Sequence, residues 1–287
     1  MIKLISSDDS VLIFGGTGFL GKELVEKLNQ DNIQNITVFA RDEGKLIQLK
    51  QKYPFINIMS GDVSDKFEVY QAMKEKKYVF HLAAFKHVGL AEKYSRECIK
   101  SNLLGSLNIL ECSMITKPKL LITTSTDKAA QVSGVYGATK YLVEELFKQF
   151  ELVNHETKYR VVRYGNVLYS TGSVLCKWRD LIEEGKEVII TDPEATRFFW
   201  TVSEAVQLLF DCMSKSDDAT PYCPEMKSMA MGDLLAAMIR KYSNGVDISV
   251  KTIGLQQGEN KHEKILKDGL SSDEVEKFTI EKIIKII

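Results

Sequence analysis

A glycine-rich turn that joins an apolar strand to a helix constrains the fold of this chain more than any other feature. Residues 11–14 are typical of a short buried strand, a glycine-rich segment follows over residues 15–21, and residues 22–29 repeat apolar side chains at helical spacing. Glycines in a GxxGxxG pattern let the backbone turn tightly, approach a pyrophosphate and pack a helix against a strand. Free N–H groups at the helix start can then bind phosphate oxygens. The pattern predicts dinucleotide contacts from Gly15, Thr17, Gly18, Phe19, Leu20 and Gly21.

Apolar segments and helical patterns alternate along the first half of the chain. Strands are predicted at residues 11–14, 36–40, 56–59, 78–84, 121–124 and 159–163. Helices are predicted over residues 99–111 and from Tyr136 to residue 153. This alternation predicts an α/β fold with a doubly wound parallel sheet, the Rossmann architecture.

The pattern changes after residue 165. Helices predicted at 175–184 and 203–213 alternate with short polar loops, and the apolar segment 278–287 is compatible with a helix or a strand. We therefore expect an NADP-binding Rossmann domain over residues 1–165 and a smaller, mainly substrate-binding part over residues 166–287.

The end of the second predicted strand indicates which dinucleotide is bound. An NAD site usually places an acidic residue there to accept a hydrogen bond from the ribose 2′-hydroxyl. Here Arg41 follows the strand, with Lys45 one helical turn further on, and two cations can clamp a 2′-phosphate. Asp42 between them can instead cap the next helix, which would leave a solvated basic pair. We favour the first interpretation and predict NADP as the cofactor.

Two further strand ends carry candidate binding residues. Asp62 follows the strand 56–59 and resembles the adenine-contacting position of such folds. It equally suits a turn. Small side chains at the end of strand 78–84 would let the backbone approach the cofactor, and a lysine and a histidine follow at the expected mouth of the active site. The residues assigned in this way are Asp62, Val63, Ala83 and Ala84 for the cofactor, and Lys86 and His87 for the substrate.

The segment 121–140 concentrates acid-base chemistry. Thr126, Asp127 and Lys128 come where a buried strand would end, and ligands of open parallel sheets lie at that edge. Tyr136 and Lys140 are four residues apart, which places both on one face of a helix. An ammonium beside a phenol would lower the pKa of Tyr136 and make it a general base. A YxxxK pair alone is often a surface turn, but the preceding strand end and the glycine pattern favour an active site.

Composition limits the remaining classes. A net charge of −1 over 287 residues gives no case for nucleic-acid binding, and five scattered cysteines give none for a metal site or a disulfide framework. No segment approaches the roughly 18 apolar residues of a membrane span. We expect a soluble, cytoplasmic protein without membrane insertion.

Taken together, these motifs resemble the extended short-chain dehydrogenase/reductases, and more narrowly the soluble UDP-N-acetylglucosamine 4,6-dehydratases of flagellin-glycan and capsule pathways. The most specific match is Thr126-Asp127-Lys128 before Tyr136-x-x-x-Lys140, and the similarity covers nearly the whole chain. The resemblance implies a homo-oligomer, with cofactor contacts from Asn102, Tyr136, Lys140 and Val167. It implies substrate contacts from Asn166, Gly172, Ser173, Val174, Thr191, Arg197 and Glu259.

The sequence departs from the family pattern mainly in the segments that bind the sugar nucleotide. The usual Arg-Pro-Gly-Glu is here Gln256-Gln257-Gly258-Glu259, and the usual Gly-Ser-Arg-Gly-Ser is here the segment 169–173, which begins with Tyr169. Both changes remove an arginine, and residues 194–195 differ as well. The sequence therefore does not identify which nucleotide sugar is bound.

The reaction that the resemblance implies is an NADP-dependent internal redox elimination. Tyr136 takes the proton of the sugar 4-hydroxyl while C4 gives up hydride, Lys128 removes the acidified C5 proton, and Asp127 protonates the departing 6-hydroxyl. Thr126 binds the 4-oxygen, and the product is a 4-keto-6-deoxy sugar nucleotide with C5 inverted, for surface glycan synthesis. The alternatives are a 4-epimerase, a ketosugar reductase, a dehydratase for another nucleotide sugar, an NADP-binding scaffold, and an inert Asp127–Lys128 ion pair.

Overall fold

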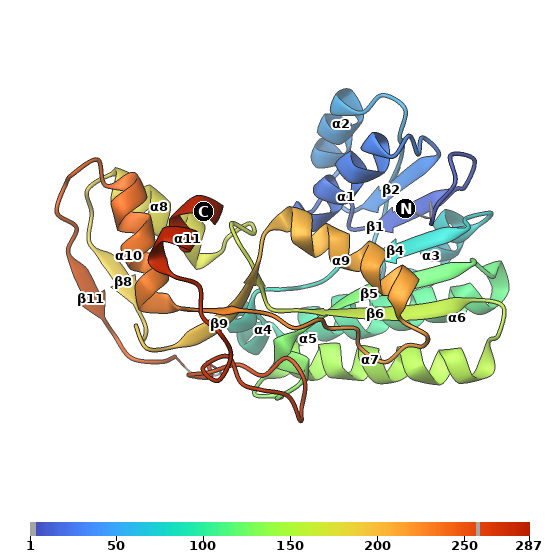
Figure 1. Cartoon of the computed structure of the whole chain (residues 1–287). Coiled ribbons are helices and arrows are strands. Elements are labelled where there is room, and N and C mark those ends of the chain that lie inside the picture. Colours follow the sequence, from blue (N-terminus) through green and yellow to red (C-terminus); the bar gives the residue numbers. More distant parts are fainter. Residues whose placement is uncertain (1–3, 257–258) are drawn as a thin grey trace. The chain divides into compact units, whose positions relative to one another are not determined.

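A six-stranded parallel sheet with the order β3-β2-β1-β4-β5-β6 carries the first part of the chain (Figure 1). The computed structural model describes residues 4–256 and 259–287. This order confirms the predicted doubly wound Rossmann sheet. The strands are β1 (Val11–Phe14), β2 (Ile36–Ala40), β3 (Asn57–Ser60), β4 (Tyr78–His81), β5 (Leu120–Thr126) and β6 (Lys158–Tyr164).

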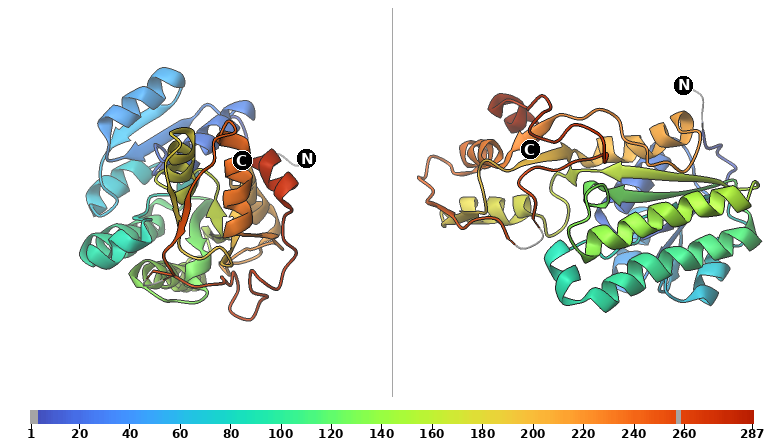
Figure 2. Two further views of the ribbon diagram at one scale, coloured as in Figure 1. Left: turned by 90° about the vertical axis from the view of Figure 1, so that its left-hand side faces the viewer. Right: turned by 90° about the horizontal axis from the view of Figure 1, so that it is seen from below.

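The inner strands are apolar because the sheet is covered on both faces. Every residue of β1, β2 and β4 is buried, as expected for a parallel sheet. Alternate side chains of the strands pack with three helices, α3 (Lys66–Met73), α6 (Gly105–Thr116) and α7 (Val135–Val153), in one core cluster. The right panel of Figure 2 shows α6 and α7 side by side along the sheet. The candidate acid-base residues therefore lie on elements that belong to this packed core.

The remaining helices of this part connect or cover the strands. Helix α2 begins after Asp42, whose side chain accepts a hydrogen bond from the Lys45 N–H, so Asp42 is the helix cap. These elements are α1 (Phe19–Gln30), α2 (Glu43–Lys52), α4 (Val88–Lys93), α5 (Ser95–Ile99), the π-helix η1 (Lys100–Leu104), the 3₁₀-helix η2 (Asp127–Ala129) and α9 (Val202–Lys215).

Two predicted elements differ from the structure. Strand β4 ends at His81, not at residue 84, and the helix predicted over 99–111 is divided into α5, η1 and α6. The cause lies in Asn102 of η1, whose side chain bonds both backbone groups of Phe85. Leu82 still donates its N–H to the Phe14 carbonyl of β1 at 2.9 Å, whereas Phe85 pairs with the Asn102 side chain instead of a neighbouring strand.

A second unit has its own small sheets and core. Strands β10, β9 and β7 form one sheet, strands β11 and β8 another, and helices α8, α10 and α11 pack around an apolar cluster that includes Trp178 and Met238. The elements are β7 (Asn166–Val167), α8 (Val174–Glu183), β8 (Val188–Ile190), β9 (Thr196–Trp200), β10 (Ser228–Ala230), α10 (Met231–Tyr242), β11 (Val250–Thr252) and α11 (Ile280–Ile286). The segment left open between helix and strand is thus the helix α11.

The division between the two units differs from the single boundary expected at residue 165. The first unit contains residues up to Arg163 and also Ser203–Tyr222, whereas the second contains Tyr164–Val202 and Cys223–Ile287. Helix α9 belongs to the first unit because Phe210 packs against Phe80 of β4, with ring centroids 6.4 Å apart. The following segment joins it because the Tyr222 N–H donates to the Val161 carbonyl at 2.8 Å.

Candidate active site

The glycine turn after β1 is shaped for the close approach of a ligand. Gly15 has a φ of +79°, and a Cβ there would lie 2.7 Å from the backbone nitrogen of Ala83. A Cβ at Gly21 would lie 2.5 Å from the Cα of Gly16. Helix α1 starts at Phe19 with neither a side-chain cap on Gly18 nor an acidic residue in its first turn. The turn therefore fits a dinucleotide pyrophosphate, whose negative charge would replace the cap.

Arg41 and Asp62, predicted at opposite parts of the adenosine site, lie together at the ends of β2 and β3. The exposed Arg41 guanidinium is 3.9 Å from the Asp62 carboxylate. Although burial acts to raise the pKa of Asp62, the Ser64 N–H and the Arg41 charge hold it below its ordinary value. Lys45 instead pairs with Asp42 at 2.8 Å. Arg41 is thus the cation oriented toward this strand end, and the expected Arg41–Lys45 clamp is not preformed.

Asn102, predicted to contact the cofactor, also has a structural function. Its Oδ1 accepts the Phe85 N–H at 2.6 Å, and its Nδ2 donates to the Phe85 carbonyl at 3.0 Å and to Thr139 Oγ1 at 3.1 Å. The side chain is buried, so the amide is occupied by protein groups. Asn102 therefore fixes the segment that carries Lys86 and His87, whose side chains are exposed.

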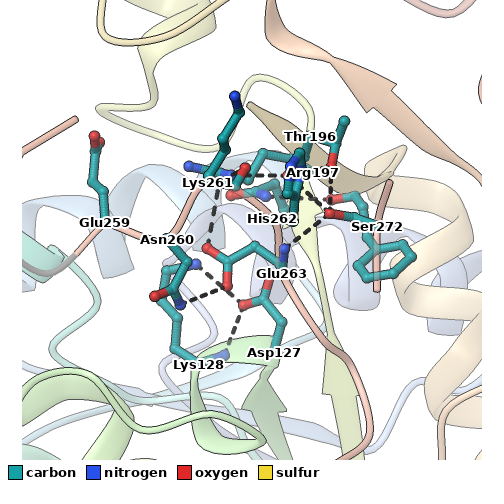
Figure 3. Close-up of polar contacts among 12 residues, drawn as sticks. Asp127, Lys128, Thr196, Arg197, Glu259, Asn260, Lys261, His262, Glu263 and Ser272 are labelled. Carbon is teal, nitrogen blue, oxygen red and sulfur yellow. Dashed lines mark hydrogen bonds and ion pairs between the residues drawn. The ribbon is translucent and has the colours of Figure 1, made fainter. Parts of the chain in front are cut away.

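The end of β5 brings three predicted catalytic side chains into contact. Asp127 Oδ1 accepts hydrogen bonds from Thr126 Oγ1 at 2.8 Å, the Lys128 N–H at 2.9 Å and Lys128 Nζ at 3.2 Å (Figure 3). Asp127 is 1% exposed, and its Oδ2 has no hydrogen-bond partner among the described residues. The carboxyl group thus has one saturated and one unused oxygen, and burial of such an oxygen is costly unless a ligand binds it.

Tyr136 lies against this group at the start of α7. Its hydroxyl bonds the Thr126 side chain, and burial raises the pKa of Tyr136 to about 12 although the Lys128 charge acts to lower it. The sequence predicted that Lys140 would be the cation that lowers this pKa. In the structure Lys140 Nζ donates to the Thr124 carbonyl at 2.8 Å, so its ammonium is directed to β5 and Lys128 acts on Tyr136 instead.

Two residues that the sequence analysis missed hold Tyr136 beside Asp127. Gly137 lets η2 lie directly on α7, because a Cβ there would collide with the Lys128 carbonyl oxygen. Glu92 of α4 accepts the Val135 N–H at 2.6 Å and so caps α7, which has no cap of its own. A glycine directly after the tyrosine was the visible signal for the first, whereas nothing in the sequence points to Glu92.

The predicted substrate residues of the second unit lie around β7, α8 and β9. Asn166 Nδ2 donates to the Phe198 carbonyl at 3.3 Å, and Ser173 precedes α8 with Gly172 at a φ of +76°. Val174 is exposed and Thr191 is half-buried. Within the second unit, these residues lie on loops and element ends, where ligands are usually bound.

Arg197 is occupied within the second unit. Its Nη1 donates to the Thr196 carbonyl at 2.8 Å and the Lys261 carbonyl at 2.9 Å, and its Nε lies 3.8 Å from the buried Glu263 (Figure 3). Glu259 is exposed and accepts the Gln256 N–H at 3.0 Å. The departure from the family pattern at Gln257, and Gly258 beside it, lie outside the described residues. Arg197 therefore braces segment 259–263, which a sequence pattern alone could not show.

Comparison with known proteins gives consistent matches over the chain. The family model "Polysaccharide biosynthesis protein" matches residues 11–286. An uncharacterized membrane protein of Methanocaldococcus jannaschii is 36% identical, over 90% of this chain and 80% of that protein. The UDP-N-acetylglucosamine 4,6-dehydratase (inverting) of Campylobacter jejuni is 35% identical over 88% and 76%, and the UDP-glucose 4-epimerase of Rickettsia bellii is 32% identical over 94% and 80%.

Solved structures share the fold. The structure of Pen from Bacillus thuringiensis superposes with a TM-score of 0.86 at 31% identity, covering 90% of this chain and 81% of that chain.

In the part of the chain that the structure describes, every helix is too short or too polar to span a lipid bilayer. The family model spans nearly the whole chain, and relatives above 30% identity cover most of it. The chain therefore belongs to the polysaccharide biosynthesis protein family.

Proposed function

We propose that this protein is an NADP-dependent nucleotide-sugar 4,6-dehydratase that acts on UDP-N-acetylglucosamine with inversion at C5. The product would be a 4-keto-6-deoxy sugar nucleotide for surface glycan synthesis. The observation that carries the proposal is the contact of buried Asp127 with half-buried Lys128 and with Thr126, whose side chain bonds Tyr136. Oxidation and elimination need these groups together, and the dehydratase relative at 35% identity supports the choice.

The nicotinamide cofactor, when bound, supplies an acceptor for the C4 hydride and returns it to C6. The glycine turn and the start of α1 would hold its pyrophosphate, and Arg41 would pair with the 2′-phosphate. Ala83 and Ala84 would pass beside it, with Tyr136 and Lys140 expected at the ribose and nicotinamide. The exposed Arg41 guanidinium at the β2 end is what favours NADP over NAD.

Tyr136 would remove the proton of the 4-hydroxyl. Its raised pKa of about 12 means that the phenolate must be stabilised when substrate is bound, and Lys128 is the cation in place to do so. Thr126 would hold the 4-oxygen, since its hydroxyl already lies between Tyr136 and Asp127. The oxidation half of the reaction therefore depends on β5 and α7 together.

The Asp127–Lys128 pair can supply both an acid and a base without gaining or losing a proton. Transfer of one proton from Lys128 Nζ to Asp127, across the 3.2 Å hydrogen bond, gives a neutral amine and a carboxylic acid. Lys128 would then remove the C5 proton of the ketosugar, and Asp127 would protonate the departing 6-hydroxyl so that water leaves.

A 4-epimerase is the second candidate, since the Rickettsia relative carries that name at 32% identity. Epimerisation needs hydride transfer at C4 but no acid for a leaving hydroxyl. Asp127 Oδ2 is buried and has no hydrogen-bond partner in residues 4–256 and 259–287, and this oxygen favours the dehydratase because a reaction without elimination leaves it unused.

Mass spectrometry distinguishes the two reactions. Purified protein with NADP⁺ and UDP-N-acetylglucosamine should yield a product that has lost one water, whereas an epimerase gives a product of unchanged mass. The changes at Gln256 and Tyr169 require the same assay with several UDP- and dTDP-sugars. Epimerised product without water loss for every sugar would contradict the proposal.

A further inference from the structure

A third ionisable residue continues the Tyr136–Lys140 face of α7. Glu144 lies one helical turn beyond Lys140, which lies one turn beyond Tyr136, so the spacing places all three on one face. Lys140 is 4% exposed and Glu144 is 1% exposed. A carboxylate removed from water in this way must have a partner.

Arg163 of β6 is that partner. Its Nε donates to Glu144 Oε1 at 3.0 Å and its Nη2 to Oε2 at 2.5 Å, a two-point pairing of guanidinium and carboxylate. Both side chains are buried, so the pair is shielded from solvent and salt. A buried carboxylate and a buried guanidinium each need such a hydrogen-bonded partner of opposite charge.

The surroundings of Lys140 make this charge important. Burial lowers the pKa of Lys140 to about 8. The charge of Glu144, and to a smaller extent Cys98, acts to raise it. His81 of β4 also faces Lys140, but burial lowers its pKa to about 3, so it is neutral. The ionisable groups on elements packed against α7 also include Glu92 and Lys93 of α4, Arg96 and Glu97 of α5, Lys100 of η1, and Asp127 and Lys128 of η2, while Tyr136 lies on α7 itself and Arg163 on β6.

We propose that Glu144 is a positioning residue, whose carboxylate, held by Arg163, keeps Lys140 in its charged form. The charged Lys140 ties α7 to β5 through the Thr124 carbonyl, two residues before Thr126 and four before Lys128. A charged donor makes a stronger hydrogen bond than a neutral amine, so the charge helps to hold Tyr136 against the end of β5. The catalytic consequence rests on the proposed function, whereas the charge coupling does not.

The direction of the effect follows from the signs of the charges. Glu144 stabilises the protonated form of Lys140, so its neutralisation lowers the pKa of Lys140. Lys140 then loses its charge at a lower pH, and the α7–β5 hydrogen bond weakens on the alkaline side first. Activity at acidic pH, where Lys140 is charged in both proteins, should change least.

The direct test measures the titration of Lys140 in cofactor-free protein. Lysine labelled with ¹³C at Cε reports each amine by NMR, and the Lys140→Arg variant identifies the resonance. We expect a pKa near 8 in the wild type and a fall of about one unit or more in Glu144→Gln. Glu145→Gln is the matched control, because Glu145 is the adjacent residue but is exposed and pairs with Lys148 at 2.8 Å. An unchanged Lys140 titration in Glu144→Gln overturns the coupling.

A double variant tests the same coupling if Glu144→Gln does not fold. Replacing both members of a buried ion pair by apolar residues of similar size is often tolerated, so Glu144→Met with Arg163→Met should fold. The Lys140 pKa should again fall, by less than in the single variant because a positive charge is lost too. Glu144→Asp, which keeps the charge, should restore a value near that of the wild type.

The catalytic part is tested by the pH profile of the oxidation half-reaction. The alkaline limb should move to lower pH in Glu144→Gln and stay in place in Glu145→Gln. A shifted NMR titration with an unmoved pH profile refutes the positioning role. Inactivity of the wild type and both variants on all nucleotide sugars counts against the proposed function, and the NMR result still decides the charge coupling.

Discussion

At the residue scale, sequence spacing located the acid-base residues but not the direction of every side chain. The structure brings Thr126, Asp127, Lys128 and Tyr136 together. The four-residue spacing of Tyr136 and Lys140 correctly predicts one helix face, yet a lysine has four rotatable side-chain bonds, and its ammonium reaches Thr124. Its actual partner depends on how α7 packs on β5, and this tertiary contact has no signature in local sequence.

Arg41 should discriminate between the two dinucleotides. In Arg41→Ala, NADP affinity should fall by about 1.5 to 3 kcal/mol, because a charge-assisted contact to the 2′-phosphate is lost. NAD affinity should change little, and Lys45→Ala should have a smaller effect because Lys45 pairs with Asp42. Fluorescence titration with both cofactors measures these values. An equal loss for NAD and NADP in Arg41→Ala would count against the NADP assignment.

Asn102 should matter for stability. Asn102→Ala leaves the half-buried Phe85 backbone groups without their side-chain partners, which should cost about 1 to 3 kcal/mol of unfolding free energy. Urea denaturation followed by circular dichroism gives the value. Asn35→Ala, at an exposed asparagine, is the control and should stay within about 0.5 kcal/mol of wild type. Wild-type stability of Asn102→Ala would show that the Phe85 segment is held by other contacts.

At the element scale, the strands were the most predictable part. Strands β1 and β2 have the predicted bounds because continuous apolar runs are typical of strands covered on both faces. The interrupted helix α5–η1–α6 was not predictable, because residues 99–111 have an ordinary helical pattern. Its π-helix accompanies the contact between Asn102 and Phe85, which lie 17 positions apart.

The glycine turn after β1 should tolerate no side chain at Gly15. Gly15→Ala should lose dinucleotide affinity and destabilise the fold by roughly 1 to 3 kcal/mol, because its φ is +79° and its Cβ would strike Ala83. Gly44→Ala, in an exposed helix with space for a Cβ, should be neutral or stabilising by up to about 1 kcal/mol. Thermal unfolding with and without cofactor measures both. Wild-type cofactor binding by Gly15→Ala would refute the role given to this turn.

At the scale of the whole molecule, the change of pattern near residue 165 revealed a second unit but not its bounds. The chain returns to the first unit over Ser203–Tyr222, and helix α9 has the same amphipathic character as the helices of the second unit. Sequence periodicity identifies a helix without naming the core on which it packs. The substrate assignments around Arg197 and Glu259 therefore stay predictions.

Self-association is the second expectation at this scale. We predict a homo-oligomer, because the sequence resembles a family whose members form dimers and larger rings. Light scattering at micromolar concentration should give a multiple of the 32.5 kDa chain mass. A strictly monomeric mass over that range would contradict the prediction.

The central claim is that one site oxidises the sugar and then eliminates water, and single-turnover absorbance at 340 nm with mass spectrometry tests it most directly. Tyr136→Phe should show no reduced cofactor when substrate is added. Asp127→Asn and Lys128→Met should accumulate reduced cofactor with an undehydrated 4-ketosugar, with turnover lowered about 10²- to 10⁴-fold. Dehydration by both of these variants at the wild-type rate would contradict the account.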